Sequence, residues 1–129
     1  MPTQFPIADM HLFPLEHSED GMLLLRNSDH LLRRFGQLDL ISLEAGERRK
    51  NPAHEEADEI WFVLRGEIKV SMVDKRGGSP SEGKEVQLVI AEDDPHGLLL
   101  PFGVACMISS KKGASLLRVS THSDREKEL

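Results

Sequence analysis

The chain has 129 residues, 39% of them hydrophobic, a formal net charge of −6 and a single cysteine. This length suits one domain with its own core, and the ordinary hydrophobic content excludes a disordered chain. The acidic balance argues against nucleic acid as a partner, no apolar run approaches the roughly 20 residues that span a membrane, and one cysteine excludes an intrachain disulfide. We therefore predict a soluble, cytoplasmic domain.

Three regions are expected along the chain. Residues 1–20 combine prolines and charges with scattered apolar side chains, which predicts an arm too short to form a core alone. We expect this arm to dock on the body, or on a second copy in a homodimer. Residues 21–120 form the folded body, and residues 121–129 form a charged tail.

Short apolar runs separated by turn residues predict β-strands through the body, with no convincing amphipathic helix. The expected strands are residues 22–25, 37–43, 59–64, 67–72, 86–90, 97–100, 104–109 and 114–119. Eight short, regularly spaced strands favour an all-β antiparallel barrel, either closed or double-sheeted. A jelly roll fits best, because closure of the sheets removes exposed strand edges.

The connections between these strands carry turn signals. The phase of the apolar residues changes near Ile41, which predicts a bulge or a strand end there. Arg65-Gly66-Glu67 is expected to be the tight turn of a hairpin, and the glycine-rich residues 75–84 a mobile loop. If residues 97–100 pair with the strand after the Pro101-Phe102-Gly103 turn, Cys106 lies opposite Leu99.

The stretch from Pro52 to Gly66 carries the candidate chemistry, because a polar loop with a histidine runs into a buried strand. His54 has the residue type that titrates near neutrality and can act as a general acid or base. Strand parity places Glu59 and Trp61 on one face; inside a barrel the pKa of Glu59 should rise. The alternatives are a loop histidine bonded to a neighbouring carboxylate, and an exposed first residue of the strand.

Three further positions are candidates for substrate binding. Arg49, within the basic run Arg48-Arg49-Lys50, could hold a diphosphate, since arginine pairs with phosphate in bidentate fashion; a solvated loop is the alternative. Trp61 could stack on a base or a sugar ring, or could simply pack in the core. Cys106 could be a soft ligand or a small buried hydrophobic residue.

The run from Gly46 to Gly66 resembles the first motif of the cupin superfamily, with Gly46, His54, Glu59 and Gly66 on motif positions. Pro52 stands where that motif has its first histidine. Pro101 and Gly103 resemble the turn of the second cupin motif, in which Cys106 occupies the histidine position. The resemblance implies a jelly-roll barrel with a small-molecule pocket, commonly in a homodimer.

Within the cupins, two segments are similar to the sugar-nucleotide branch. Residues 97–105 resemble the deoxysugar 3,5-epimerases, and residues 46–54 resemble the 3,4-ketoisomerases, with Arg49 and His54 on matching positions. Those enzymes work without a metal, with histidine as acid or base beside a ketosugar carbonyl. The chain departs from both patterns, since it has no tyrosine to serve as the epimerase acid and has Pro52 in place of a ketoisomerase histidine.

Three functions follow from these residues. The first is a metal-independent isomerase or epimerase of nucleotide sugars, with His54 as acid/base, Glu59 as its partner or second acid/base, and Arg49, Trp61 and Cys106 contacting the substrate. The second is a metal-binding cupin of oxygenase or isomerase type, in which His54, Glu59 and Cys106 would hold a divalent ion. The third is a non-catalytic cupin that binds a small molecule.

Overall fold

The computed structural model of the protein describes residues 7–17, 19–20, 23–24, 32–51 and 57–122. Within these ranges every regular element is a β-strand: β1 (His11–Pro14), β2 (Glu16–His17), β3 (Leu23–Leu24), β4 (Gln37–Leu43), β5 (Arg48–Asn51), β6 (Glu59–Asp74), β7 (Glu85–Ala91), β8 (His96–Leu100), β9 (Val104–Ser109) and β10 (Ala114–Ser120). No helix in this part of the chain is long and apolar enough to cross a membrane.

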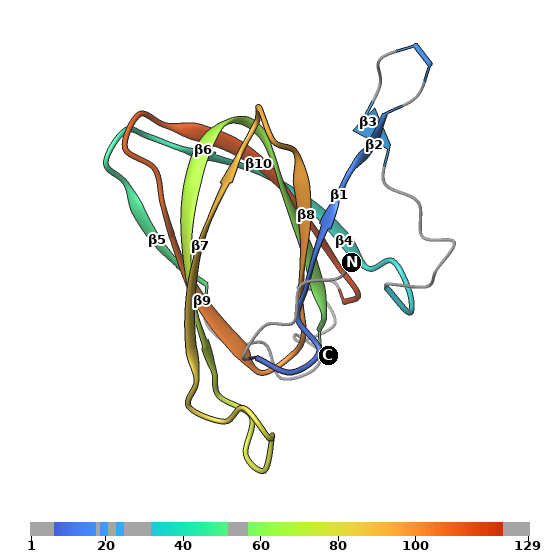
Figure 1. The fold of residues 1–129 in the computed structure, drawn as a ribbon, viewed down its shortest axis with the longest axis vertical. Helices are drawn as coiled ribbons and strands as arrows, with labels where there is room; N and C mark the ends of the chain where they lie inside the picture. Colours follow the sequence, from blue (N-terminus) through green and yellow to red (C-terminus); the bar gives the residue numbers. More distant parts are fainter. Residues whose placement is uncertain (1–6, 18, 21–22, 25–31, 52–56, 123–129) are drawn as a thin grey trace.

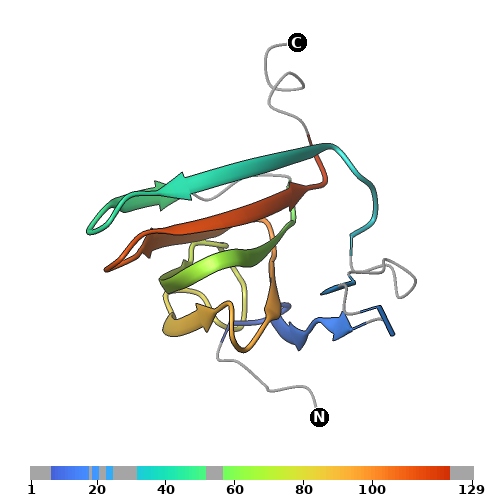
Figure 2. The same ribbon diagram turned by 90° about the horizontal axis from the view of Figure 1, so that it is seen from above.

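Eight of these strands form two antiparallel layers that share β6, and β2 pairs with β3 in a separate two-stranded sheet. One layer has the order β1-β8-β6-β10-β4, and in the other β9 lies between β5 and β6, while β7 pairs with the far edge of β6. Figure 1 shows the layers facing each other, with β5, β9 and β7 on one side and β8 and β10 on the other; Figure 2 shows β4 at the edge of its layer. The predicted antiparallel jelly roll is confirmed. Its core is built from inward-facing aliphatic side chains of both layers, such as Leu98, Ile108 and Leu116.

Strand β6 is continuous through 16 residues, so the predicted hairpin at Arg65-Gly66-Glu67 is wrong. Residues 59–66 of β6 pair with β10, and residues 67–74 pair with β7 and β9. Gly66 lies where the strand passes from one layer to the other, beside a register shift in the pairing with β10. Its φ is 85°, and a Cβ there would lie 2.5 Å from the carbonyl oxygen of Gly113, so the glycine bends a strand and does not end it.

Two further expectations of strand geometry are wrong. Strand β8 pairs with β1 and β6, while β9 pairs with β5 and β6, so Cys106 lies opposite Asn51 and Met72 and not opposite Leu99. The turn after β8 carries the chain from one layer to the other. Strand β4 pairs with β10 in one unbroken register without the expected bulge, because Ile41 points inward and Leu40, 70% exposed, points to the outer face.

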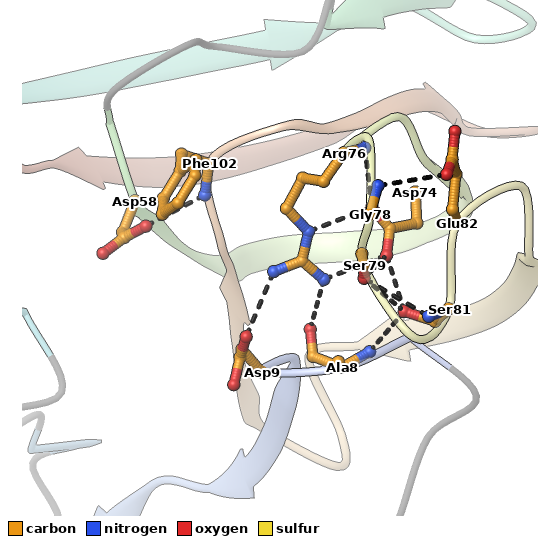
Figure 3. A network of polar contacts seen from close by, with 10 residues as sticks. All are labelled: Ala8, Asp9, Asp58, Asp74, Arg76, Gly78, Ser79, Ser81, Glu82 and Phe102. Atoms are coloured by element: carbon orange, nitrogen blue, oxygen red, sulfur yellow. Dashed lines mark hydrogen bonds and ion pairs between the residues drawn. The ribbon is translucent and has the colours of Figure 1, made fainter.

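The segment before β1 packs on the same chain's barrel. Ile7 and Met10 are core residues, and Arg76 from the β6–β7 loop donates to the carbonyl oxygen of Ala8 at 2.7 Å and to Asp9 at 3.1 Å (Figure 3). The loop that was expected to be mobile is therefore tied to the N-terminal segment. The hydrogen bond from the amide of Ala8 to Ser81, at 2.8 Å, makes the same connection.

Candidate functional site

The candidate site is built around Glu59, the first residue of β6. Its side chain is buried, as are Trp61 and Val63, and all three point between the layers. The face predicted from strand parity is therefore confirmed, and an exposed Glu59 is excluded. A carboxyl group in this position needs polar partners, because burial without them costs several kcal/mol.

Two other strands supply the partners of the Glu59 carboxyl. Asn51, the last residue of β5, donates from Nδ2 to Oε1 at 3.0 Å. Arg118, on β10, places its Nε 3.4 Å from Oε2. The indole N–H of Trp61 also acts on the carboxyl, although its Nε1 is buried without a partner in hydrogen-bonding geometry. The carboxyl thus faces three nitrogen donors and makes one short hydrogen bond.

Burial raises the pKa of Glu59 above its ordinary value, and this effect outweighs the lowering by Arg118 and Asn51. The negative charge of Asp39 adds to the rise. A carboxyl with a raised pKa keeps its proton closer to neutral pH than an exposed glutamate does, which is the property required of a general acid.

Arg118 belongs to this cluster but was not among the site residues predicted from the sequence. It binds Asp39 of β4 through Nε at 2.9 Å and Nη2 at 2.8 Å, donates from Nη1 to Asn51 at 2.8 Å, and lies over the Trp61 ring at 5.3 Å from its centroid. A signal was available, since Arg118 lies in phase with the fully buried Leu116 two residues earlier. An arginine on the inward face of a strand must find charged or polar partners there.

Cys106 lies beside this cluster, opposite Asn51 in the pairing of β5 with β9. Burial, reinforced by the charge of Glu59, raises the pKa of the thiol to about 12. The side chain therefore stays protonated at neutral pH and is neither a nucleophile nor a thiolate ligand as it stands.

The donor set suits a divalent metal poorly. A ligating thiol must lose its proton, and the guanidinium of Arg118 occupies the space 3.4 Å from Glu59 where it would repel a cation. In the part of the chain that the structure describes, no three His, Cys, Asp or Glu side chains come together as metal ligands. His54, the third ligand of the metal hypothesis, lies outside the described residues.

Arg49 lies on the same strand as Asn51 and two residues before it. Its guanidinium is 44% exposed, pairs with Glu47 at 2.8 Å and reaches the carbonyl oxygen of Ser42 at 3.5 Å. The backbone amide of Glu44 and the guanidinium of Arg49 hold the pKa of Glu47 below its ordinary value. The basic run is thus the exposed strand β5 and not a loop, and the contacts of Arg49 described here are with Glu47 and Ser42.

A hollow of about 500 Å³ lies along β5, β9, β6 and β7, within the size range of small-molecule pockets. Asn51 and Cys106 are among its lining residues, together with Met72, Val86 and Met107. Of the five predicted site residues, Glu59, Trp61 and Cys106 thus form one cluster with Asn51 and Arg118. Arg49 lies nearby on β5, and His54 falls outside the described residues.

Solved structures of other proteins share the fold of this chain. A dTDP sugar isomerase from Desulfovibrio desulfuricans G20 superposes with a TM-score of 0.82 at 21% identity, over 93% of this chain and 81% of that one. A dTDP-6-deoxy-D-glucose-3,5-epimerase from Legionella pneumophila Philadelphia 1, in complex with dTDP-4-keto-L-rhamnose, gives 0.81 at 19% identity, over 98% and 74%. The chain has the cupin fold of the sugar-nucleotide epimerases. The jelly-roll fold that the cupin resemblance implies is thereby confirmed.

One curated relative matches this chain in sequence. It is the spore coat polysaccharide biosynthesis protein SpsL of Bacillus subtilis (strain 168), 34% identical over 94 residues, which cover 70% of this chain. The match spans 62% of that relative's length. No family model matches the chain.

Proposed function

We propose that this cupin is a metal-independent isomerase or epimerase that acts on a nucleotide sugar. The observation that carries the proposal is the buried Glu59, held by Asn51 and Arg118 inside a fold shared with dTDP-sugar isomerases and epimerases. A relative concerned with spore coat polysaccharide synthesis supports a carbohydrate substrate. The ligand of the Legionella enzyme, a dTDP-ketosugar, is the substrate class to try first.

The proposed chemistry is enolisation beside the ketone of the sugar. His54 removes a proton from the carbon next to the carbonyl, and the electron pair of that C–H bond enters the enolate. Glu59, a buried carboxyl with a raised pKa, is the second acid/base group. Trp61 and Cys106 contact the substrate in this proposal, and Arg49, whose side chain is 44% exposed, takes the diphosphate.

Solvent exchange tests the proposal directly. The protein is incubated with a dTDP-4-ketosugar in D₂O, and the sugar is followed by mass spectrometry and proton NMR. We expect deuterium at the carbon beside the carbonyl, with isomerised or epimerised product. His54→Asn should lower the exchange rate at least about 100-fold, the usual worth of a general base. His11→Asn, an exposed histidine of β1, is the matched control and should exchange normally.

Three outcomes would count against this proposal. If no nucleotide sugar raises the melting temperature of the protein or exchanges deuterium, the protein is not an enzyme of this class. If exchange occurs and His54→Asn leaves it unchanged, His54 is not the base. Binding without exchange would favour a non-catalytic small-molecule-binding cupin, for which the hollow next to Asn51 and Cys106 is the candidate pocket.

A homodimer and a cytoplasmic location belong to the same proposal. Two exposed leucines on the outer face of the edge strand β4, Leu38 at 54% and Leu40 at 70%, support association with a second copy. Light scattering over a concentration series is expected to give twice the 14.5 kDa mass of the chain. A monomer at all concentrations would refute the dimer.

A further inference from the structure

Three charged side chains from three neighbouring strands meet between the layers. Asp39, Arg118 and Trp61 are register partners across β4, β10 and β6, and Glu59 lies two residues before Trp61 on the same face. Arg118 therefore lies between two carboxyls. Its distances to them are unequal, since it contacts Asp39 at 2.8 and 2.9 Å and Glu59 at 3.4 Å.

Two further contacts hold the guanidinium in place. Nη1 donates to Asn51 at 2.8 Å, and the plane lies over the Trp61 ring. Asp39 is itself oriented, because Gln37 donates from Nε2 to its second oxygen at 2.7 Å. One arginine cannot neutralise two carboxylates in a buried space, and the geometry favours Asp39 for the ion pair.

We propose that Asp39 withholds Arg118 from Glu59, so that Glu59 carries the proton that is delivered to the sugar enolate. The first half of this inference is that Asp39 controls the Arg118–Glu59 contact, and the second half is that Glu59 gives its proton to the enolate. Only the second half rests on the proposed function. In that step the Glu59 O–H bond breaks, the proton passes to the enolate and a carboxylate remains. The proton that the base took from the substrate is released to solvent, and Glu59 recovers one from solvent, so the cycle needs no further reactant. Asp39 and Arg118 are positioning residues in this scheme.

The surroundings of Glu59 agree with a proton that is held and then given up. Among the described residues, the titratable and charged groups that act on it are Asp39 from β4, Arg118 from β10 and Cys106 from β9, whose thiol stays neutral. Among the residues that the structure describes, the buried indole N–H of Trp61 has no partner in hydrogen-bonding geometry, although it acts on this carboxyl. When the proton leaves, this N–H can donate a charge-assisted hydrogen bond to the Glu59 carboxylate that forms. Such a bond is stronger than one to the neutral carboxyl and stabilises the ionised form.

The first half can be tested on the ligand-free protein. The pKa of Glu59 is measured by carbon-13 NMR of side-chain-labelled glutamate, with Glu59→Gln identifying the resonance. In Asp39→Asn, a nearly isosteric change, Arg118 is free to turn to Glu59, and we expect the Glu59 pKa to fall. In Arg118→Met it should rise. Asp93→Asn, which changes the net charge equally at an exposed site, should leave it unchanged. An unchanged or raised Glu59 pKa in Asp39→Asn overturns the inference, even if Arg118→Met fails to fold.

The second half needs turnover. With Glu59 as the proton donor, the alkaline limb of kcat/KM against pH should move to lower pH in Asp39→Asn, by the same number of pH units as the NMR titration. If the titration moves and the limb does not, Glu59 is not the donor. If the wild-type protein turns over no nucleotide sugar, the proposed function fails, while the titration still decides whether Asp39 controls the Arg118–Glu59 contact.

Discussion

Two buried carboxyls of this barrel lie beside an arginine, and their protonation is driven in opposite directions. Asp74, at the end of β6, is 1% exposed, and the Arg76 guanidinium beside it holds the pKa of that carboxyl well below its usual range. Glu59, at the other end of the same strand, is 6% exposed, and burial raises its pKa. The exposed fractions of the two side chains are nearly equal, so the partners of each carboxyl must contribute to the difference.

The two sites differ in the number of donors that lie within hydrogen-bonding distance of the carboxyl. Asp74 accepts from the side chain of Arg76 at 3.0 Å through both Nε and Nη2, from the Arg76 amide at 2.9 Å, from Ser79 at 2.8 Å and from Ser81 at 2.6 Å (Figure 3). Glu59 accepts one hydrogen bond, from Asn51, and shares its arginine with Asp39. A buried carboxylate is stable only when its donors replace the water it has lost, so Asp74 serves structure and Glu59 is left able to carry a proton.

Replacing each carboxyl by its amide should lower the free energy of unfolding more at Asp74 than at Glu59. Asp74→Asn removes a negative charge that accepts hydrogen bonds from five donors. It also leaves Arg76, which is partly buried, without its main counter-ion. We expect a loss of about 3–5 kcal/mol in the free energy of unfolding, the usual cost of removing one partner of a buried pair. Urea denaturation at pH 7 measures it.

The control for Asp74→Asn is the neighbouring exposed residue, Lys75→Met, which should stay within about 0.5 kcal/mol of the wild type. A loss of less than about 1 kcal/mol in Asp74→Asn would show that the loop network contributes little, and that the comparison with Glu59 has no energetic basis.

The same strand shows what the sequence could predict of the fold. Strand parity counted from Glu59, and the alternation of apolar residues after Gly66, fix two strand faces correctly, because side-chain period depends only on local geometry. A glycine with positive φ is equally suited to a hairpin turn and to a bend within a strand, so the sequence around Gly66 does not distinguish the two. Which of the two forms depends on pairing with β10, a contact remote in sequence.

The site was predictable to a similar extent. Strand parity placed Glu59 and Trp61 inside the barrel, since both belong to one strand. Arg118 and Asp39 lie 59 and 20 residues from Glu59 along the chain, and only the order β6-β10-β4 brings them to it. The inward phase of Arg118 was visible in its own strand, but the sharing of one arginine between two acids appears only when three strands are paired.

Glu59→Gln should affect stability far less than Asp74→Asn and affect catalysis far more. The amide has the shape of the protonated carboxyl and can still accept from Asn51, so we expect a change within about 1 kcal/mol in the free energy of unfolding. Turnover of a dTDP-ketosugar should fall at least about 100-fold. Glu67→Gln, an exposed glutamate on the same strand, controls for the substitution. A large loss of stability in Glu59→Gln would identify Glu59 as a second structural acid and make the two sites alike.

The smallest expected effect is a pH dependence of stability with opposite sign at the two sites. A folded-state pKa below the unfolded value makes the Asp74 contribution fully present above about pH 4, and it is lost as the pH falls. A folded-state pKa above the unfolded value makes the Glu59 contribution fully present below about pH 4, and it is lost as the pH rises through the raised pKa. Urea unfolding of the wild type and Glu59→Gln between pH 4 and pH 8 isolates the second term, because the other ionisations cancel in the difference. We expect the wild type to lose stability relative to Glu59→Gln as the pH rises, and then to level off. A difference that is constant with pH would mean that Glu59 titrates as it does in the unfolded chain, and the contrast with Asp74 would then reduce to the strength of one ion pair.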